Sequence, residues 1–302
     1  MYIYCLGARG QINQVSRIEQ GMVELGAYSN GPDMADAIYC NDPGYYDAAL
    51  GFKNKKKIFN VLDIPPHLLD DKKYDISRYS YIHHGLPRSF NPEELREKLL
   101  QADVVTCICD EVKWQLKKWC EIDAITIYNP VQDVREADKF ETINGNKYKY
   151  LYVGRANDPN KRFEWVKDFI LCMGDRPEDL CSVGPENPHY GHHYGFVDEG
   201  VLAVLYHHVN YLLFPSAFKS IGLPALEAVI AGTIPIVTND DPCSDEFFKN
   251  IAVSVEVSTA ADMVKNPLWD SLASSWVKKN GPIFAEKFSG KQIAQNILEI
   301  VK

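Results

Sequence analysis

Residues 215–235 read Pro-Ser-Ala-Phe-Lys-Ser-Ile-Gly-Leu-Pro-Ala-Leu-Glu-Ala-Val-Ile-Ala-Gly-Thr-Ile-Pro and directly follow the apolar run Tyr-Leu-Leu-Phe at 211–214. The apolar run predicts a buried strand, and the apolar spacing over 222–232 predicts a helix. The Ser-Ile-Gly-Leu-Pro turn between them would present unpaired N–H groups at the positive end of that helix. A strand, a glycine turn and a helix in this order would provide a site for a pyrophosphate group.

One charged residue, Glu227, interrupts the apolar part of this predicted helix. A carboxylate on an apolar helix face needs a polar partner if it is partly buried. The diol of a ribose is one candidate partner. The alternative is that Glu227 lies on the exposed side of an amphipathic helix and binds nothing.

A second strand and turn precede this region. The run Tyr-Leu-Tyr-Val at 150–153 predicts a strand that ends in Gly154-Arg155, and Lys161 follows Arg155 by six residues, at the start of a predicted helix. An arginine fork and a lysine point charge at the end of a strand would suit a phosphate clamp. Basic residues at a helix start can equally be plain surface residues, so both interpretations stay open.

Strand-like and helix-like segments alternate along the whole chain. The predicted strands cover 1–6, 36–40, 57–62, 103–109, 123–128, 148–153, 180–183, 209–214 and 234–238. The predicted helices cover 13–25, 92–101, 110–120, 161–173, 199–208, 222–232 and 290–301. This alternation requires parallel strands with helical crossovers, so the predicted fold class is α/β, with two Rossmann-like, doubly wound domains facing a central cleft. The polar stretch 129–146 is the predicted linker, and ligands are expected at the carboxyl ends of the strands.

Composition sets further limits on the protein. A length of 302 residues predicts two domains, and a net charge of −9 argues against a surface that binds nucleic acid everywhere. The chain has no apolar run of transmembrane length and no leader-like start, so a cytoplasmic protein without a transmembrane segment is expected. The eight cysteines are dispersed with no CxxC pair, which predicts buried thiols in a reducing compartment.

The motifs resemble the C-terminal, donor-binding domain of the GT-B glycosyltransferases, in particular their large retaining group known as family 4. The matching pieces occur in the family's order: Val153-Gly154-Arg155 with Lys161, Ser182-Val183-Gly184, Gly195-Phe196-Val197-Asp198, and Pro215 through Val237. The chain departs from the family at Lys219, where the family carries the first of two glutamates, the second of which matches Glu227. A lysine cannot accept hydrogen bonds from sugar hydroxyls, so Lys219 would pair with a donor phosphate or a carboxylate, or serve an unusual sugar.

The resemblance implies a role for each matched residue. In the donor domain it implies nucleotide-sugar contacts from Arg155, Lys161, Phe196, Val197, Lys219, Ser220, Ile221, Gly222, Leu223 and Glu227, with Phe196 and Val197 beside the nucleobase. In the N-terminal half it implies acceptor binding, with Gly10 in a loop near the donor phosphates and Asp63 or His84 near the reaction centre. A tight turn, a capping aspartate and a loop histidine are the alternatives for these three. The implied domains are 1–135 and 136–287, with a terminal helix over 288–302 that packs back on the first.

The resemblance further implies sugar transfer with retention of anomeric configuration. The chain contains no Asp-x-Asp, so Arg155, Lys161 and the amides of 221–223 would stabilise the departing diphosphate instead of a metal. We therefore expect no cofactor and no metal, and a UDP- or GDP-linked sugar as the donor substrate. The histidines at 189, 192 and 193 suggest a metal site, but they lack matched cysteine or carboxylate spacing, and a contact with the nucleobase is the other interpretation.

The predicted function is the transfer of a sugar from a nucleotide-sugar donor to an acceptor hydroxyl. The acceptor is a glycan, a lipid-linked saccharide or a hydroxylated DNA base. The last two could use the basic clusters Lys53–Lys57 and Lys113–Trp119, which would otherwise be solvated faces. Two other functions stay open: a nucleotide-sugar epimerase, since one such family shares this architecture, and a non-catalytic nucleotide-sugar binder, which Lys219 motivates.

Overall fold

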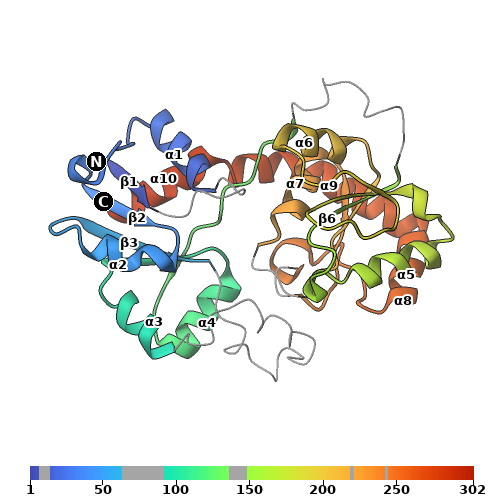
Figure 1. The fold of residues 1–302 in the computed structure, drawn as a ribbon, viewed down its shortest axis with the longest axis horizontal. Coiled ribbons are helices and arrows are strands. Elements are labelled where there is room, and N and C mark those ends of the chain that lie inside the picture. Colours follow the sequence, from blue (N-terminus) through green and yellow to red (C-terminus); the bar gives the residue numbers. More distant parts are fainter. Residues whose placement is uncertain (7–13, 63–91, 136–147, 218–220, 242–243) are drawn as a thin grey trace. The chain divides into compact units, whose positions relative to one another are not determined.

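The computed structural model describes residues 1–6, 14–62, 92–135, 148–217, 221–241 and 244–302 (Figure 1). Contacts between residues divide them into two compact units. The first contains the described residues up to Val131 together with Glu286–Lys302, and the second contains those of Gln132–Ala285. Each unit is built on a parallel sheet of five strands, which confirms the predicted α/β fold class.

The first unit has the sheet order β1-β2-β3-β4-β5. Its strands are β1 (Ile3–Leu6), β2 (Ala37–Cys40), β3 (Lys56–Val61), β4 (Val104–Cys107) and β5 (Ile125–Thr126). Its helices are α1 (Gln14–Glu24), α2 (Tyr46–Leu50), α3 (Pro92–Leu99), α4 (Asp110–Cys120) and α10 (Gly290–Val301). A parallel bridge joins Ile3 to Tyr28 on the side of β1 opposite β2, so the chain changes its winding direction at β1.

A row of buried polar side chains crosses the middle of this sheet. Thr106 on β4 donates a hydrogen bond of 2.8 Å to Oδ1 of Asn60 on β3, and Nδ2 of Asn60 donates one of 2.5 Å to Oδ1 of Asn41. All three side chains are almost fully excluded from solvent. Because hydrogen bonds link Thr106 to Asn60 and Asn60 to Asn41, the row ties β3 to β4 and to the end of β2.

The last helix, α10, packs on the first helix, α1 (Figure 1). Its buried face consists of Ile293, Ala294, Ile297 and Val301, which join the apolar core formed with β1, β2 and β3. The hydroxyl of Ser289 caps the helix by accepting from the N–H of Gln292 at 3.1 Å. The two helices come so close that a methyl group at Gly21 would lie 2.2 Å from the carbonyl oxygen of Gly290.

The second unit has the sheet order β10-β9-β6-β7-β8. Its strands are β6 (Tyr150–Val153), β7 (Leu180–Val183), β8 (His192–His193), β9 (Tyr211–Leu213) and β10 (Ile234–Ile236). Its helices are α5 (Phe163–Met173), α6 (Glu199–His207), α7 (Leu223–Ala231), α8 (Val257–Lys265) and α9 (Pro267–Lys287). β7 pairs on one side of β6 and β9 on the other, so the winding direction changes between β6 and β9.

Two helices and one strand of this unit are absent from the sequence-based assignment. Helix α9 runs through Asn280-Gly281-Pro282, a sequence that ordinarily ends a helix. Gly281 has a packing role there, because a methyl group at this position would lie 2.7 Å from the carbonyl oxygen of Val229 on α7. Helix α8 and the two-residue strand β8 also lie outside the predicted segments.

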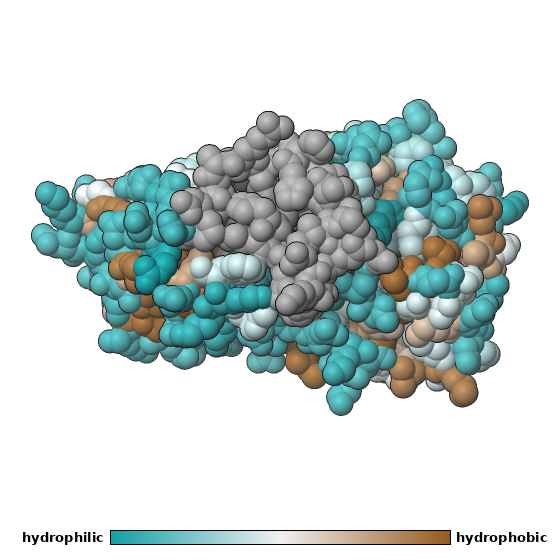
Figure 2. All heavy atoms as spheres, turned by 90° about the horizontal axis from the view of Figure 1, so that it is seen from below, coloured by the Kyte–Doolittle hydropathy of each residue, from teal (hydrophilic) through white to brown (hydrophobic). Residues whose placement is uncertain are grey.

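The described part of the face in Figure 2 is predominantly hydrophilic, with hydrophobic residues in small groups. Such a surface is ordinary, because isolated apolar residues are common on globular proteins. In the described ranges, no helix is both long enough and apolar enough to cross a bilayer.

We expect Gly21→Ala to lower the free energy of unfolding by about 1–3 kcal/mol, because the backbones of α1 and α10 would have to move apart. This loss would outweigh the roughly 1 kcal/mol that alanine gains over glycine inside a helix. Urea denaturation measures the change. Gly31→Ala is the control, since a methyl group there meets nothing within 4 Å. A Gly21→Ala protein as stable as the wild type would contradict the close helix crossing.

Candidate functional site

The carboxyl ends of β6 and β9 form the natural ligand position in the second unit. In open parallel sheets, ligands bind where the winding direction changes, because the loops leaving two neighbouring strands there diverge to opposite faces. The loop after β6 contains residues 154–162, and the loop after β9 leads to the start of α7. The two loops are joined directly, since the N–H of Ala217 donates to the carbonyl oxygen of Asn160 at 2.9 Å.

The first loop carries the two predicted phosphate-binding cations. Arg155 donates to Oδ2 of Asp158 at 2.7 Å, yet its side chain remains 64% exposed. Asp158 also accepts from the N–H of Asn160 at 3.0 Å and so caps the short turn Pro159–Lys161. The Asp158 side chain is 18% exposed, but the exposure of the guanidinium weakens the ion pair, so Arg155 can exchange Asp158 for a stronger anion.

Lys161 lies next to the residues that follow strands β6 and β9. Its Nζ is 5.6 Å from the ring centroid of Phe214, the residue after β9. Its Cδ would lie 3.7 Å from a methyl group at Gly154, the residue after β6. The lysine stem therefore runs along the ends of both strands, which places its ammonium near the loop that leads to α7.

The second loop ends at Gly222, which precedes the first residue of α7. Gly222 has φ of 68°, a left-handed conformation that glycine adopts without strain. Pro224 occupies the first turn of the helix, and no side chain of the described residues caps the helix start. The early N–H groups of α7 therefore point toward the carboxyl edge of the sheet with the positive end of the helix dipole. Ile221 is buried and Leu223 half-buried.

Glu227 is a buried residue, with 6% of its surface exposed. Its Oε2 accepts a hydrogen bond of 3.0 Å from the hydroxyl of Tyr206 on α6. Burial, together with the nearby Glu227 carboxylate, raises the pKa of Tyr206 well above its ordinary value, so the phenol stays neutral and donates. The exposed helix position considered for Glu227 is therefore wrong, and a tyrosine that sequence reasoning missed is one of its partners.

Three glycines bring the loops after β6, β7 and β8 close together. The N–H of Gly184 donates to the carbonyl oxygen of Gly195 at 3.0 Å, and a methyl group at Gly184 would lie 2.1 Å from the carbonyl oxygen of Gly154. Phe196, which follows Gly195, is 61% exposed at this edge of the sheet, and Val197 is half-buried. An exposed aromatic ring beside a ligand crevice is available for stacking.

The histidines of this region form aromatic and hydrogen-bond contacts. The Nδ1 of His193 lies 3.0 Å from Oγ of Ser182 on β7, and the ring of His192 stacks on Tyr148. Burial and the neighbouring His192 lower the pKa of His193, which favours its neutral form. Within the described residues, no group of three or more His, Cys, Asp or Glu side chains is arranged to hold a metal ion.

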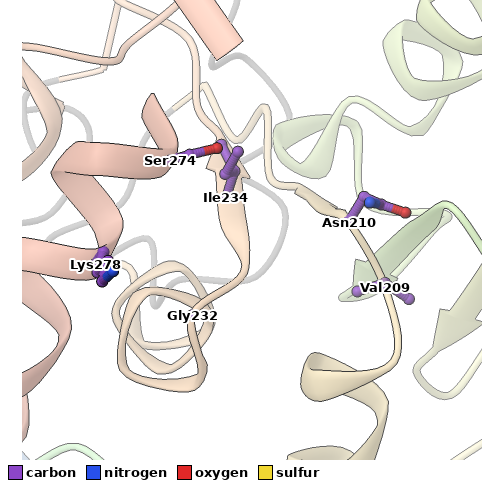
Figure 3. Close-up of a pocket in the computed structure, with 6 residues that line it drawn as sticks. All are labelled: Val209, Asn210, Gly232, Ile234, Ser274 and Lys278. Atoms are coloured by element: carbon purple, nitrogen blue, oxygen red, sulfur yellow. The ribbon is translucent and has the colours of Figure 1, made fainter. Parts of the chain in front are cut away.

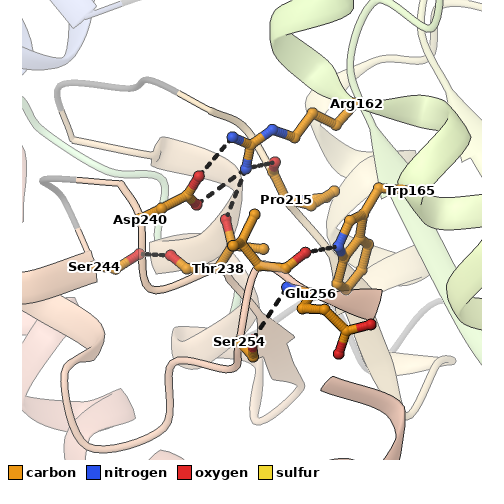
Figure 4. A network of polar contacts seen from close by, with 9 residues as sticks. Arg162, Trp165, Pro215, Thr238, Asp240, Ser244, Ser254 and Glu256 are labelled. Carbon is orange, nitrogen blue, oxygen red and sulfur yellow. Dashed lines mark hydrogen bonds and ion pairs between the residues drawn. The ribbon is translucent and has the colours of Figure 1, made fainter. Parts of the chain in front are cut away.

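A second basic residue, Arg162, forms a largely buried network next to Lys161 (Figure 4). Its guanidinium donates to both carboxylate oxygens of Asp240, at 3.0 Å and 2.6 Å. It also donates to Oγ1 of Thr238 and to the carbonyl oxygen of Pro215, each at 3.4 Å. Burial raises the pKa of Asp240, but Arg162 and Thr238 outweigh this effect and hold it below its ordinary value.

The opposite edge of the same sheet carries an open cavity of about 390 Å³ (Figure 3). It is lined by Val209, Asn210, Gly232, Ile234, Ser274 and Lys278. Asn210 and Gly232 precede β9 and β10, so the cavity lies at the amino-terminal ends of the strands. None of the predicted site residues that the structure describes lines it.

The structure therefore brings Arg155, Lys161, Ile221, Gly222 and Leu223 to the same edge of one sheet. Phe196 and Val197 lie in a loop at that edge, and Glu227 is buried one helical turn into α7. The other predicted site residues, Gly10, Asp63, His84, Lys219 and Ser220, lie outside the described residues.

Several solved glycosyltransferase structures are similar to this one. The Anabaena protein HepE, solved in complex with UDP, matches all of this chain and 99% of its own, with a TM-score of 0.68 and 13% sequence identity. Sucrose-phosphate synthase from Thermosynechococcus elongatus matches 88% of this chain and 73% of its own, with a TM-score of 0.60 and 18% identity. TarM of S. aureus matches 95% of this chain and 58% of its own, with a TM-score of 0.62 and 14% identity. The chain has the GT-B fold of these proteins, which confirms at the level of the fold the resemblance found in the sequence.

Among curated proteins, an uncharacterized 41.2 kDa protein in the cps region of Klebsiella pneumoniae is 29% identical over 223 residues. The match covers 64% of this chain and 56% of that protein, so the chain spans about half the length of this relative. No family model matches the sequence.

We expect Tyr206→Phe to lower the free energy of unfolding by about 1.5–3 kcal/mol, the usual contribution of a hydrogen bond to a charged group. Without the phenol, the buried Glu227 carboxylate loses a donor. Thermal or urea unfolding measures the change. Tyr194→Phe is the matched control, because its hydroxyl bonds to the uncharged Tyr148 hydroxyl at 3.5 Å. Equal losses in the two variants would contradict a special role for the Tyr206–Glu227 bond.

Proposed function

We propose that this protein is a glycosyltransferase that moves a sugar from a nucleoside diphosphate sugar to an acceptor hydroxyl. One observation carries the proposal. The cation-bearing loop after β6 and the start of α7 lie at the same edge of the sheet, where the winding direction changes, and a hydrogen bond joins the two loops. The GT-B fold supports it, as do the HepE structures solved with UDP and with UDP-glucose. By this comparison UDP is the preferred donor nucleotide, with GDP as the alternative.

The proposed chemistry rests on stabilising a leaving diphosphate. Cleaving the bond between sugar and nucleotide places negative charge on the departing diphosphate. The guanidinium of Arg155 would bind two of its oxygens, Lys161 would add a point charge, and the N–H groups from Ile221 to Leu223 would donate at the helix start. Since these groups are held before the reaction, they would lower its barrier without a metal ion. Retention of anomeric configuration is part of the proposal.

With the diphosphate at this position, the ribose and nucleobase of the nucleotide sugar would meet the residues around it. The Glu227 carboxylate would accept from the ribose hydroxyls, with Tyr206 holding its other side. Phe196 and Val197 would border the nucleobase. Gly10, Lys219 and Ser220 complete the proposed donor set, and Asp63 or His84 would face the acceptor. We assign residues 1–135 with 288–302 to acceptor binding and 136–287 to donor binding, in a cytoplasmic protein.

For the acceptor substrate we propose three chemical classes. A glycan, a lipid-linked saccharide and a hydroxylated DNA base are the three candidates. Transfer assays with a radiolabelled UDP-sugar and one representative of each class separate them. Tight donor binding without hydrolysis or transfer to any of the three would instead indicate a nucleotide-sugar binder, and conversion of the donor sugar would indicate an epimerase.

We expect Arg155→Ala and Lys161→Ala each to weaken UDP binding by about 10- to 100-fold, the range of one charge-assisted hydrogen bond of about 1.5–3 kcal/mol. Isothermal titration calorimetry measures the affinity. Lys167→Ala on α5 is the control, because its ammonium pairs with Glu164 on the helix surface. If both crevice variants bound UDP as tightly as this control, the proposed diphosphate site would be wrong.

A further inference from the structure

Arg162 follows Lys161 directly, but its side chain has a different environment. The Arg162 side chain is only 14% exposed, and that of Asp240 is 21% exposed. Both carboxylate oxygens of Asp240 accept from it, so the pair has the paired geometry that orients a guanidinium most strongly. Arg162 is therefore occupied within the protein, whereas the exposed Arg155 is placed to meet a ligand.

The contacts of Arg162 join three separate chain segments (Figure 4). Its backbone lies between the turn that carries Lys161 and the first residue of α5. Its guanidinium reaches the carbonyl of Pro215, where the loop toward α7 begins, and Thr238 with Asp240 beyond β10. One side chain thus connects the exits of β6, β9 and β10.

The backbone conformation of Arg162 also indicates that its side-chain contacts fix the local chain path. Its φ of 49° lies in the left-handed region, which is unfavourable for a residue with a side chain. Such a conformation persists only where surrounding contacts hold it. The four hydrogen bonds of the guanidinium supply those contacts, and the resulting bend in the chain directs Lys161 toward the end of β9.

We propose that Arg162, through Asp240 and Pro215, is a positioning residue that sets the spacing between Lys161 and the start of α7 so that both reach one diphosphate. The inference rests on the proposed function. Groups that act together on one ligand lose much of their effect when displaced by about 1 Å. Loss of Arg162 would therefore weaken recognition of the second phosphate more than recognition of the nucleoside.

The ratio of UDP to UMP affinity tests this role, because the two ligands share the base, the ribose and one phosphate. We expect Arg162→Met to reduce the preference for UDP over UMP at least tenfold, and Arg162→Lys to reduce it less, since lysine keeps the charge but not the paired geometry. Calorimetry gives both affinities. If the wild type prefers guanine nucleotides, the same comparison is made with GDP and GMP in place of UDP and UMP.

A double variant separates positioning from stability. Arg162→Met leaves the Asp240 carboxylate without the guanidinium and should lower the urea midpoint. In Arg162→Met with Asp240→Asn the carboxylate charge is gone, so the urea midpoint should rise toward that of the wild type while the UDP preference stays low. Arg135→Met is the matched control, since Arg135 makes the same paired contact with Asp133 on the surface, where its side chain is 50% exposed.

Two results would overturn the inference. One is an unchanged UDP-to-UMP ratio in a folded Arg162→Met protein. The other is recovery of both the ratio and the urea midpoint in the double variant, which would leave Arg162 a purely structural residue. A wild type that binds neither UDP nor GDP would instead overturn the proposed function, so the two failures are distinguishable.

Discussion

The pairing of β6 with both β7 and β9 is the constraint on which the second unit depends. Parallel strands need helical crossovers, and a chain that fills one side of β6 before crossing to the other sends successive loops to opposite faces. The loops after β6 and β9 therefore leave the sheet side by side at the position where open parallel sheets bind ligands. The described residues assigned to the diphosphate, which are Arg155, Lys161 and 221–223, lie on one of these two loops or at the helix start that follows.

The two arginines of the loop after β6 differ in how far their side chains are exposed. The Arg155 side chain is 64% exposed and meets Asp158 through one hydrogen bond, whereas the Arg162 side chain is 14% exposed and pairs with the Asp240 carboxylate through two. In the proposed function the guanidinium of Arg155 thus binds a ligand, whereas that of Arg162 holds parts of the protein together. Buried charge pairs contribute little net stability, but they hold geometry firmly, because each partner is costly to leave alone.

The parts of the site that the sequence predicts are those encoded in contiguous motifs. Two examples are the strand that ends in Gly154-Arg155 and the glycine turn at Gly222 that begins a helix. Both depend on neighbouring residues, so the sequence alone predicts them. The Tyr206–Glu227 bond is invisible in the sequence because its members lie on different helices with no fixed spacing rule. The Arg162–Asp240 pair is hidden for the same reason, since 78 residues separate its members. Helix α9 is missed because Asn280-Gly281-Pro282 resembles a break, and the packing of Gly281 on α7 overrides that local preference.

The return of α10 to α1 has a consequence for biosynthesis. The N-terminal core includes Ile293, Ile297 and Val301, which leave the ribosome only after the entire second sheet has been made. Domains usually fold in the order in which they are translated. Here an apolar surface of the earlier-synthesised unit stays uncovered until α10 has been made, which exposes that unit to aggregation during translation.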